Sequence, residues 1–311
     1  MASAKIDKIA QDIKTMRIRG AGRIARAAAK ALKIASKESK AKTPAEFTKE
    51  IAQVSKLLLN TRPTAVSLPN AIQYVSIALK QANDLDLQKL KKAVISRADE
   101  FIKNSNEAVK RIGEIGANRI LDGDVILTHC NSQSALSVIK TAFRQGKHIE
   151  VFVTESRPVW QGRLSARELL KEGIPTTMII DSAARHFMRD IDKVIVGADS
   201  IAANGAVVNK IGTSAIALAA HEARTLFFVA AETYKFHPET LVGSLVKIEE
   251  RDPSEIINLK RYPKLKVRNP SFDITPAEYV DLIITEQGII SPYAAYSIIQ
   301  DIFKWTLGKK V

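Results

Sequence analysis

Polar side chains with exchangeable protons follow several short apolar segments of this sequence. Cys130, which is the only cysteine among the 311 residues, ends the segment DVILTHC. Four carboxylates stand at the ends of later apolar segments, and they are Glu155, Asp181, Asp199 and Glu232. None of the five matches the apolar residues before it, so a structural role inside a strand is unfavourable. A thiol and carboxylates whose pKa values are shifted by their surroundings can serve as acid and base catalysts.

Cys130 stands between an apolar segment and the helical pattern at 134–146. A helix N-terminus favours the thiolate, and this position therefore predicts a lowered pKa for Cys130. The alternative is a small buried apolar side chain, which is the commonest fate of a free cysteine. The neighbouring His129 would face the opposite side of a strand, so the sequence does not favour a catalytic His129.

Candidate ligands for a phosphorylated substrate lie at predicted helix starts and in basic loops. The motifs that contain them are RGAG, TRPT, NSQS, ESRPVWQGR and NKIGTSA. The candidate residues are Arg19, Gly20, Arg62, Ser132, Arg157, Asn209 and Lys210. Helix N-terminal N–H groups and arginine side chains bind phosphate oxygens well. Each arginine has a surface charge as its alternative, and Ser132 and Asp181 have helix capping as theirs.

Two different patterns along the chain predict the elements that position these residues. Up to about residue 120, apolar residues recur at helical spacing, and no strand pattern of any length precedes residue 123. Continuous apolar runs separated by helical segments follow, at 124–130, 149–156, 176–183, 193–200, 226–233 and 279–286. Such runs indicate a parallel sheet with helices on both faces, whose ligands bind beyond the carboxyl ends of the strands. We therefore predict an α/β protein, with a helical N-terminal domain at 1–122 and a Rossmann-like catalytic domain at 123–311.

The composition indicates an ordinary globular protein with an excess of positive charge. The net charge is +14, and residues 1–60 alone carry 14 Lys and Arg against 5 Asp and Glu. These basic residues are interleaved with apolar ones at helical spacing, and no zinc-ligand or RNA-binding motif is present, so a nucleic-acid partner is not favoured. No dinucleotide fingerprint and no P-loop pattern is present either. One cysteine, no apolar run long enough for a membrane and no signal-peptide pattern favour a cytoplasmic protein without a membrane partner.

Six motifs, in this order, resemble a known superfamily over nearly the whole chain. They are RGAG, TRPTAV, THCNS, ESRPVWQG, GADSIAANGAVVNKIGT and AAETYKFHP. The superfamily contains the methylthioribose-1-phosphate isomerases, the archaeal ribose-1,5-bisphosphate isomerases and the regulatory subunits of translation initiation factor 2B. The motifs AAETYKFHPE, DSAARHFM and RDPSE make the chain most similar to the archaeal ribose-1,5-bisphosphate isomerases. Where methylthioribose isomerases typically have Asn-Thr-Gly after the cysteine, this chain has Asn131, Ser132 and Gln133.

The resemblance implies an active-site cysteine and aspartate, which match Cys130 in THCNS and Asp199 in GADS. The initiation-factor branch generally lacks this pair, so its presence favours an enzyme. The implied reaction converts ribose 1,5-bisphosphate to ribulose 1,5-bisphosphate. In archaea this step would connect the degradation of AMP and other nucleoside phosphates to RuBisCO. The family also implies a homo-hexamer built from dimers, no metal or other cofactor, and AMP as an activator. Two alternatives stay open: a binding subunit like those of initiation factor 2B, and a methylthioribose-1-phosphate isomerase.

The anomeric phosphate of the implied pentose substrate decides which chemistry these residues would perform. The sugar ring cannot open freely, so an acid must protonate the ring oxygen and a base must take the proton from carbon 2. We hypothesise that Asp199, protonated in a dry pocket, is the acid and that Cys130 acts at carbon 2. A hydride shift, in which Cys130 only assists proton transfer, is the alternative. The two phosphates would be held by Arg19, Arg62, Arg157 and Lys210, with the Ser132 region and the Gly20 backbone.

Overall fold

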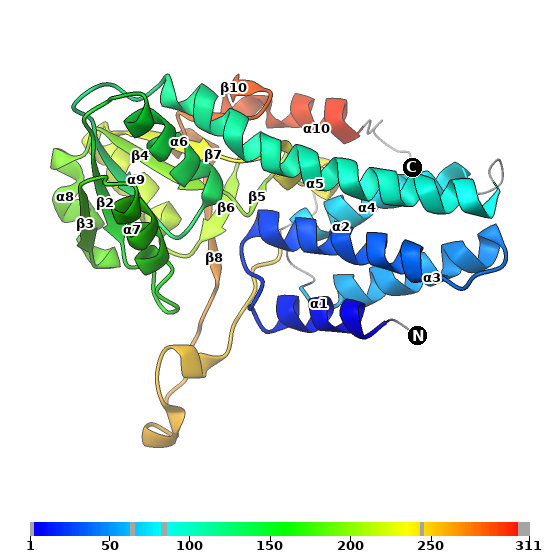
Figure 1. Cartoon of the computed structure of the whole chain (residues 1–311). Coiled ribbons are helices and arrows are strands. Elements are labelled where there is room, and N and C mark those ends of the chain that lie inside the picture. Colours follow the sequence, from blue (N-terminus) through cyan, green and yellow to red (C-terminus); the bar gives the residue numbers. More distant parts are fainter. Residues whose placement is uncertain (1–2, 63–65, 82–85, 243–245, 304–311) are drawn as a thin grey trace. The chain divides into compact units, whose positions relative to one another are not determined.

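The computed structural model describes residues 3–62, 66–81, 86–242 and 246–303 of the chain (Figure 1). The chain divides into two compact units, Met1–Glu107 and Ala108–Val311, so the division falls inside helix α5 (Leu87–Ala117). The boundary predicted from the sequence, at residue 122, lies after α5 has ended. The two positions differ because the last part of α5 contributes Ile112 and Ala117 to the core of the sheet unit.

The first unit is helical throughout the part that the structure describes, as the sequence predicts. Its helices are α1 (Ala4–Lys14), α2 (Ala21–Glu38), α3 (Pro44–Leu59), α4 (Ser67–Ser76), the 3₁₀ helix η1 (Ile77–Gln81) and the first part of α5. α3 begins directly after Thr43, whose hydroxyl caps the helix by accepting a hydrogen bond from the Glu46 N–H at 3.2 Å. Fully buried side chains on the helices form the core of this unit, among them Ile13, Ile24, Leu32, Phe47, Ile51 and Leu68.

The second unit is built on a seven-stranded sheet with the order β10-β9-β7-β4-β1-β2-β3. Its strands are β1 (Val125–Thr128), β2 (Glu150–Thr154), β3 (Thr176–Ile179), β4 (Lys193–Gly197), β7 (Leu226–Ala230), β9 (Leu282–Thr285) and β10 (Gly288–Ile290). All neighbouring strands pair in parallel except β10, which pairs antiparallel with β9. The predicted α/β class with a parallel sheet is therefore confirmed, and six of the seven strands fall within the predicted apolar runs.

Helices cover both faces of this sheet, which explains why its strands are apolar without alternation (Figure 1). One face packs against α6 (Gln133–Arg144), α7 (Gly162–Lys171) and the end of α5, and strand residues such as Ile126, Ile195 and Phe228 lie in that core. The other face packs against α8 (Ala184–Phe187), α9 (Thr213–Ala223) and α10 (Ala295–Phe303). No helix in the described residues is both long enough and apolar enough to span a membrane.

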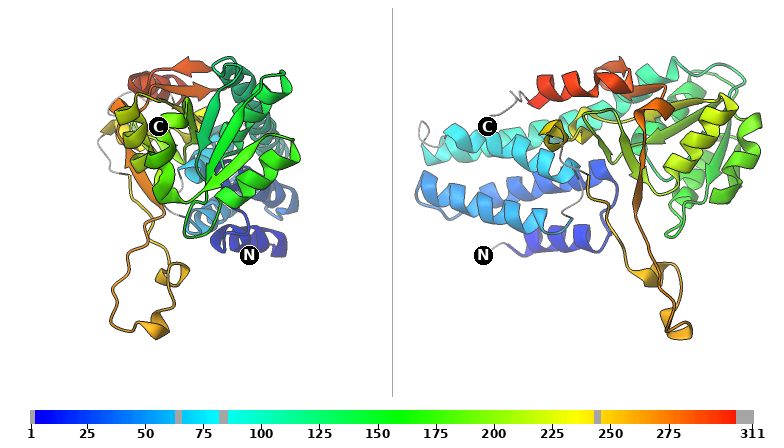
Figure 2. Two further views of the ribbon diagram at one scale, coloured as in Figure 1. Left: turned by 90° about the vertical axis from the view of Figure 1, so that its left-hand side faces the viewer. Right: turned by 180° about the vertical axis from the view of Figure 1, so that it is seen from behind.

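The second unit also contains a small antiparallel sheet of three strands, which the sequence analysis did not predict. It consists of β5 (Ser200–Ile201), β6 (Val207–Lys210) and β8 (Phe272–Thr275), in that order. β5 has only two residues, and β8 is more than sixty residues further along the chain than β6, so local periodicity does not reveal the pairing. The segment that leads to β8 projects away from the large sheet (Figure 2). The small sheet positions the residues that follow β4 and those that precede α9.

A buried ion pair joins the start of β1 to the start of β4. The Lys193 ammonium lies 2.6 Å from each carboxylate oxygen of Asp124, and the two side chains are only 8% and 6% exposed. Asp124 Oδ2 also accepts the Leu121 N–H at 2.6 Å. Asp124 therefore connects β4, through Lys193, to the residues between α5 and β1, through Leu121.

The Asp124→Asn variant is expected to lose about 3–5 kcal/mol of unfolding free energy, because Lys193 would stay buried without a counterion. Urea-induced unfolding of the variant and the parent measures this loss. The matched control is Asp190→Asn, since the exposed Asp190 carboxylate lies 3.7 Å from the exposed Arg189 guanidinium and is expected to change stability by about 0.5 kcal/mol or less. A loss of under about 1 kcal/mol for Asp124→Asn would contradict the importance of this pair.

Candidate active site

The carboxyl ends of β1, β2, β3 and β4 lie side by side at one edge of the large sheet, because these strands are parallel neighbours. Cys130 follows β1, Ser156 follows β2, Asp181 follows β3 and Asp199 follows β4. The charges of Asp181, Asp199 and Lys210 all act on the Cys130 thiol. The structure therefore brings together Cys130, Asp181 and Asp199, which the sequence places at strand ends, and Lys210 of the NKIGTSA motif.

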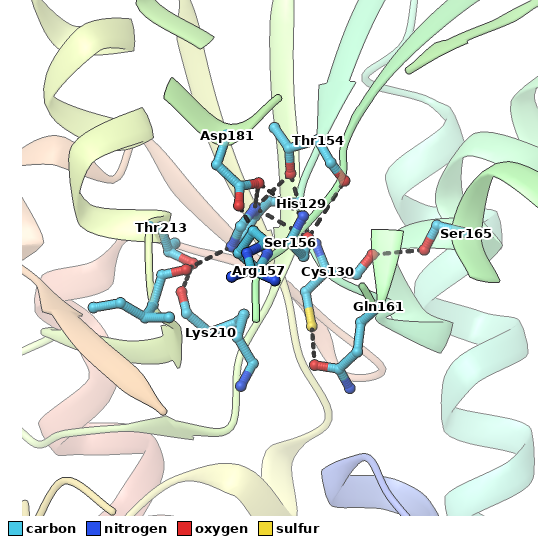
Figure 3. Close-up of polar contacts among 12 residues, drawn as sticks. His129, Cys130, Thr154, Ser156, Arg157, Gln161, Ser165, Asp181, Lys210 and Thr213 are labelled. Atoms are coloured by element: carbon cyan, nitrogen blue, oxygen red, sulfur yellow. Dashed lines mark hydrogen bonds and ion pairs between the residues drawn. The ribbon is translucent and has the colours of Figure 1, made fainter. Parts of the chain in front are cut away.

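Cys130 has a strained backbone that three hydrogen bonds hold in place. Its φ of 68° lies in the left-handed region, which costs free energy for any residue other than glycine. Its N–H donates to the Ser156 hydroxyl at 2.8 Å, and its carbonyl accepts from the Ser165 hydroxyl at 2.6 Å. Its S–H donates to Gln161 Oε1 at 3.3 Å (Figure 3). The sulfur points in the same direction as the Gln161 amide and the Lys210 ammonium.

The predicted lowering of the Cys130 pKa is wrong. Burial raises the pKa of Cys130 to about 11, Lys210 opposes this rise, and Asp199 and Asp181 add to it. The helix dipole does not compensate, because α6 begins at Gln133 and the effect of a dipole falls off within the first turn of a helix. Near neutral pH the resting site therefore holds a protonated thiol.

Iodoacetamide is expected to alkylate folded Cys130 slowly, because only the thiolate reacts. At pH 8 the rate is expected to be about 10²-fold below that of the same cysteine in the urea-unfolded chain, whose pKa is near the usual ~8.5. The rate should then rise about tenfold per pH unit towards the raised pKa of about 11. Since the chain has a single cysteine, mass spectrometry reports this site alone. A rate that levels off below pH 9 would contradict the buried thiol.

His129 has a structural position beneath this site. Its ring is buried, with Nδ1 2.6 Å from the Thr154 hydroxyl and Nε2 2.9 Å from the Ile211 carbonyl. Burial lowers the pKa of His129, and the charge of Asp181 opposes this only in part, so the ring is neutral and donates from Nε2 to the carbonyl. Gly212 packs closely here, since a Cβ atom would lie 3.3 Å from the ring. His129 thus links β1 to the segment before α9, and its ring bonds away from the Cys130 sulfur, as its alternation with Cys130 predicts.

Asp181 holds the loop after β2 instead of capping the helix that follows it. The N-cap residue of the 3₁₀ helix η2 (Asp181–Ala183) is Ile180. The two oxygens of the Asp181 carboxylate accept the N–H groups of Ser156 and Arg157, both at 2.7 Å. The capping alternative for Asp181 is therefore wrong, because its carboxylate reaches across the sheet edge to a neighbouring strand. Arg157, a predicted phosphate ligand, enters the site from this loop.

The Arg157 guanidinium lies 4.7 Å from the centre of the Trp160 ring, and the Arg163 guanidinium lies 4.0 Å from it. These cation–π contacts hold both arginines on one aromatic surface close to the site. An arginine held in this way loses little further conformational freedom when it binds a phosphate.

Asp199 and Lys210 are positioned by the small sheet. The Asp199 N–H donates to the Val208 carbonyl at 2.9 Å, and the Asp199 side chain is half-buried. Lys210 is buried at the end of β6, with its ammonium 4.9 Å from the centre of the Phe272 ring. The amide of the buried Asn209 donates to the Thr213 hydroxyl at 3.0 Å. Pairing of β6 with β5 and β8 therefore fixes the backbone that carries Asp199, Asn209 and Lys210.

The predicted anion site at the start of α9 already holds a carboxylate. Asp273 Oδ2 accepts the Gly212 N–H at 2.7 Å and the Ser214 N–H at 3.1 Å. Burial raises the pKa of Asp273 to about 6, although these N–H donors and the charge of Lys210 lower it. A substrate phosphate could reach the same N–H groups only after Asp273 had moved. The NKIGTSA motif is therefore better suited to phosphate binding through the Lys210 ammonium than through the helix terminus.

Ser132 caps α6, which was one of its two predicted roles. Its hydroxyl accepts the Ala135 N–H at 3.3 Å, and it packs so closely on Gly197 that a Cβ atom there would lie 2.2 Å from the hydroxyl oxygen. Gly197, the first residue of GADS, is thus required by the helix cap that Ser132 makes after Cys130. The role of Ser132 as a substrate ligand stays a prediction.

The remaining predicted phosphate ligands belong to the helical unit. Gly20 is the N-cap residue of α2 and has a φ of 89°, and Arg19 directly precedes it. The buried Arg62 lies with Nη1 3.3 Å from the Met16 sulfur, so the structure places it beside the turn that leads to Arg19. All three stay predicted ligands of the substrate.

Sequence reasoning missed several residues that shape the site, namely Ser156, Gln161, Ser165 and Asp273. It also missed the buried ion pair after β7, in which Lys235 Nζ lies 2.6 Å from Glu232 Oε2. The motifs ESRPVWQG and AAETYKFHP contain most of these residues, but no spacing within them indicates their partners. Within the described ranges, no group of three or more His, Cys, Asp or Glu side chains is arranged to hold a metal ion.

The fold and the strand-end site define an α/β protein that matches known proteins over most of its length. Residues 17–292 match the Initiation factor 2 subunit family. A protein of Pyrococcus furiosus named ribose 1,5-bisphosphate isomerase is 57% identical over 98% of this chain and 96% of its own. One of Thermococcus kodakarensis with the same name is 58% identical over 96% of this chain and 95% of its own. The solved structure of translation initiation factor eIF-2B from Pyrococcus horikoshii has a TM-score of 0.82 and 36% identity, and covers 93% of this chain and 98% of that one.

The chain belongs to the Initiation factor 2 subunit family. These two relatives, at 57% and 58% identity, are named as isomerases, whereas the structure named as an initiation factor is 36% identical to this chain. The resemblance predicted from the motifs, including the similarity to the archaeal ribose-1,5-bisphosphate isomerases, is therefore confirmed.

Proposed function

We propose that this chain is an aldose–ketose isomerase that converts ribose 1,5-bisphosphate to ribulose 1,5-bisphosphate at the strand-end site. The observation that carries the proposal is that Cys130 and Asp199 follow two neighbouring parallel strands, β1 and β4, and that the charge of Asp199 acts on the thiol. Relatives that are 57% and 58% identical over nearly the whole chain are named for this substrate. The initiation-factor and methylthioribose alternatives have less support, because their sequences are more distant.

The protonated thiol suggests how the two groups become an acid and a base. A proton that passes from Cys130 to Asp199 produces both species that the reaction needs, a thiolate and a carboxylic acid. Asp199 then protonates the ring oxygen as its bond to carbon 1 breaks, and the thiolate takes the proton from carbon 2. The resulting enediol becomes the ketose when its carbon-2 hydroxyl loses a proton and carbon 1 gains one.

Binding of the bisphosphate would favour these transfers through its charges and its position. Lys210 already lowers the pKa of Cys130, so it acts in the direction that the thiolate needs. Arg157 and Lys210 enter the site from two different segments, the loop after β2 and the end of β6. Two cationic anchors of this kind could fix the ends of a bisphosphate and so orient carbon 1 and carbon 2.

A hydride shift from carbon 2 to carbon 1 is a second candidate mechanism, and the raised pKa of Cys130 favours it because the thiol could then stay protonated. Substrate carrying deuterium at carbon 2 separates the two mechanisms. Proton transfer through the thiolate would release deuterium to water, whereas a hydride shift would deliver it to carbon 1 of the product.

Direct assay of the purified chain tests the proposed function. Ribulose 1,5-bisphosphate is expected to form from ribose 1,5-bisphosphate, and methylthioribose 1-phosphate is expected to react far more slowly in the same assay. No detectable turnover of ribose 1,5-bisphosphate, with or without AMP, would refute the proposal.

We further propose, from the family resemblance, that AMP activates the enzyme, that no metal or other cofactor is needed, and that the chain assembles as a homo-oligomer built from dimers. Adding AMP and EDTA in separate arms of the assay tests the first two points. Light scattering after size-exclusion chromatography tests the third, for which a hexamer is the expected result.

A further inference from the structure

The loop between β2 and α7 surrounds Cys130 with acceptors for two of its hydrogens. At its start, the Ser156 hydroxyl accepts the Cys130 N–H at 2.8 Å. At its end, Gln161 Oε1 accepts the S–H at 3.3 Å (Figure 3). One loop therefore contacts both the backbone and the sulfur of the same residue.

This loop is held firmly at both ends. Asp181 accepts the N–H groups of Ser156 and Arg157, which fixes the start. At the other end, Gly162 approaches β2 so closely that a Cβ atom would lie 1.7 Å from the Thr154 carbonyl oxygen. Ser156 and Trp160 both have left-handed backbones, with φ values of 59° and 58°. Such strain persists only where surrounding contacts determine the conformation, so the loop presents Gln161 in a defined place.

Gln161 is well suited to orient the side chain of Cys130 through its hydrogen bond with the S–H group. Gln161 is only 8% exposed, so water does not compete freely for the S–H. The Lys210 ammonium points the same way as the sulfur and the Gln161 amide in the close-up view (Figure 3), and its charge acts on the thiol. The S–H bond points towards the amide oxygen, so the sulfur lone pairs face other groups of the site.

We propose that Gln161 is a positioning residue for the reaction, and that its amide oxygen orients the Cys130 sulfur towards the substrate carbon. The proposal rests on the proposed function of Cys130 in proton transfer. A rotated sulfur would still be a thiol, but its distance to the substrate carbon would increase, and misplacement of about 1 Å can cost about 10²-fold in rate.

The kinetic test is Gln161→Leu, which keeps the approximate size of the side chain and removes the acceptor. We expect kcat to fall about 10- to 10²-fold, with KM changed by less than about threefold, because the amide orients a reacting group and does not hold phosphate. The matched control is Gln145→Leu, at the exposed C-cap of α6, which is expected to leave both constants unchanged. A kcat within about twofold of the parent for Gln161→Leu would overturn the proposal.

A second test needs neither substrate nor turnover, and it uses two charged substitutions at the same position. A carboxylate in place of the amide would stabilise the neutral thiol, and an ammonium would stabilise the thiolate. At pH 9, iodoacetamide should therefore alkylate Gln161→Glu more slowly than the parent and Gln161→Lys faster, by at least about threefold each. Rates within about 1.5-fold of the parent in both variants would show that Gln161 does not contact the sulfur.

The two tests separate failure of this inference from failure of the proposed function. If Cys130→Ser is inactive while Gln161→Leu retains the parent kcat, the positioning role alone is wrong. If Cys130→Ser retains full activity, the proposed function of the thiol is wrong, and the positioning role falls with it. Urea unfolding of each variant identifies a kinetic loss that comes from misfolding, and in that case the alkylation rates of the charged variants decide.

Discussion

The Cys130→Ser variant is expected to have a kcat/KM about 10²- to 10⁴-fold below that of the parent, because general acid–base catalysis by a positioned group typically contributes that much. A serine hydroxyl is nearly isosteric and could donate to Gln161 as the thiol does, while the backbone N–H of residue 130 would still donate to Ser156. It loses its proton far less readily than a thiol, so it cannot act as the base at carbon 2. Initial rates of ribulose 1,5-bisphosphate formation over a range of substrate concentrations measure the effect.

Two further measurements make this result specific to the thiol. The urea midpoint of Cys130→Ser is expected to stay close to that of the parent, since the N–H and carbonyl contacts of residue 130 do not depend on the sulfur. The Cys130→Ala variant should be as inactive as Cys130→Ser if proton transfer is the essential role. Full activity in Cys130→Ala would show instead that residue 130 is only a small buried side chain.

The Asp199→Asn variant is expected to lower kcat about 10²- to 10⁴-fold with a smaller change in KM, because an amide cannot deliver a proton to the ring oxygen. The same variant has an expected effect on the resting thiol. The negative charge of Asp199 raises the pKa of Cys130, so its removal should lower that pKa and accelerate alkylation at pH 9. Kinetic assays and alkylation rates of one protein preparation give both results.

The matched control for this variant is Asp301→Asn, on the exposed side of α10, which should change neither the turnover nor the alkylation rate. Loss of turnover without faster alkylation would mean that Asp199 acts on the substrate but not on the thiol. Unchanged turnover in Asp199→Asn would remove Asp199 from the proposed mechanism.

The sequence was sufficient to predict the elements that carry the site. The runs DVILT, EVFVT and KVIVG are apolar at successive positions because both of their faces are buried, and this pattern distinguishes them from surface strands. Parallel pairing then requires that their carboxyl ends meet at one edge, so residues such as Cys130 and Asp199 could be placed near each other before any coordinates. The motif resemblance, which supplied their roles, is also a property of the sequence alone.

The small sheet is a part of the fold that the local sequence pattern did not predict. β5 is too short to display a period, and β6 pairs with β8, which lies more than sixty residues further along the chain. As a result, the sequence could not show that Asp273 lies at the start of α9. It predicted a free helix terminus for an anion, whereas the fold places a carboxylate there.

What the sequence by itself determined was the α/β class, the order of six strands of the large sheet and the helices between them, and the set of residues at the strand ends, because these depend on periodicity within short segments. Only the tertiary structure decided the protonation state and the hydrogen-bond partners of those residues. The pKa of Cys130 rises instead of falling because burial, a property of the whole packed site, outweighs the local helix dipole. Cys130 bonds to Ser156 and Gln161 in the loop after β2, and both lie more than twenty residues further along the chain. That loop is held in turn by Asp181, which is again more than twenty residues beyond Ser156. Desolvation and hydrogen bonding between distant segments are set by packing, and no pattern within one segment contains them.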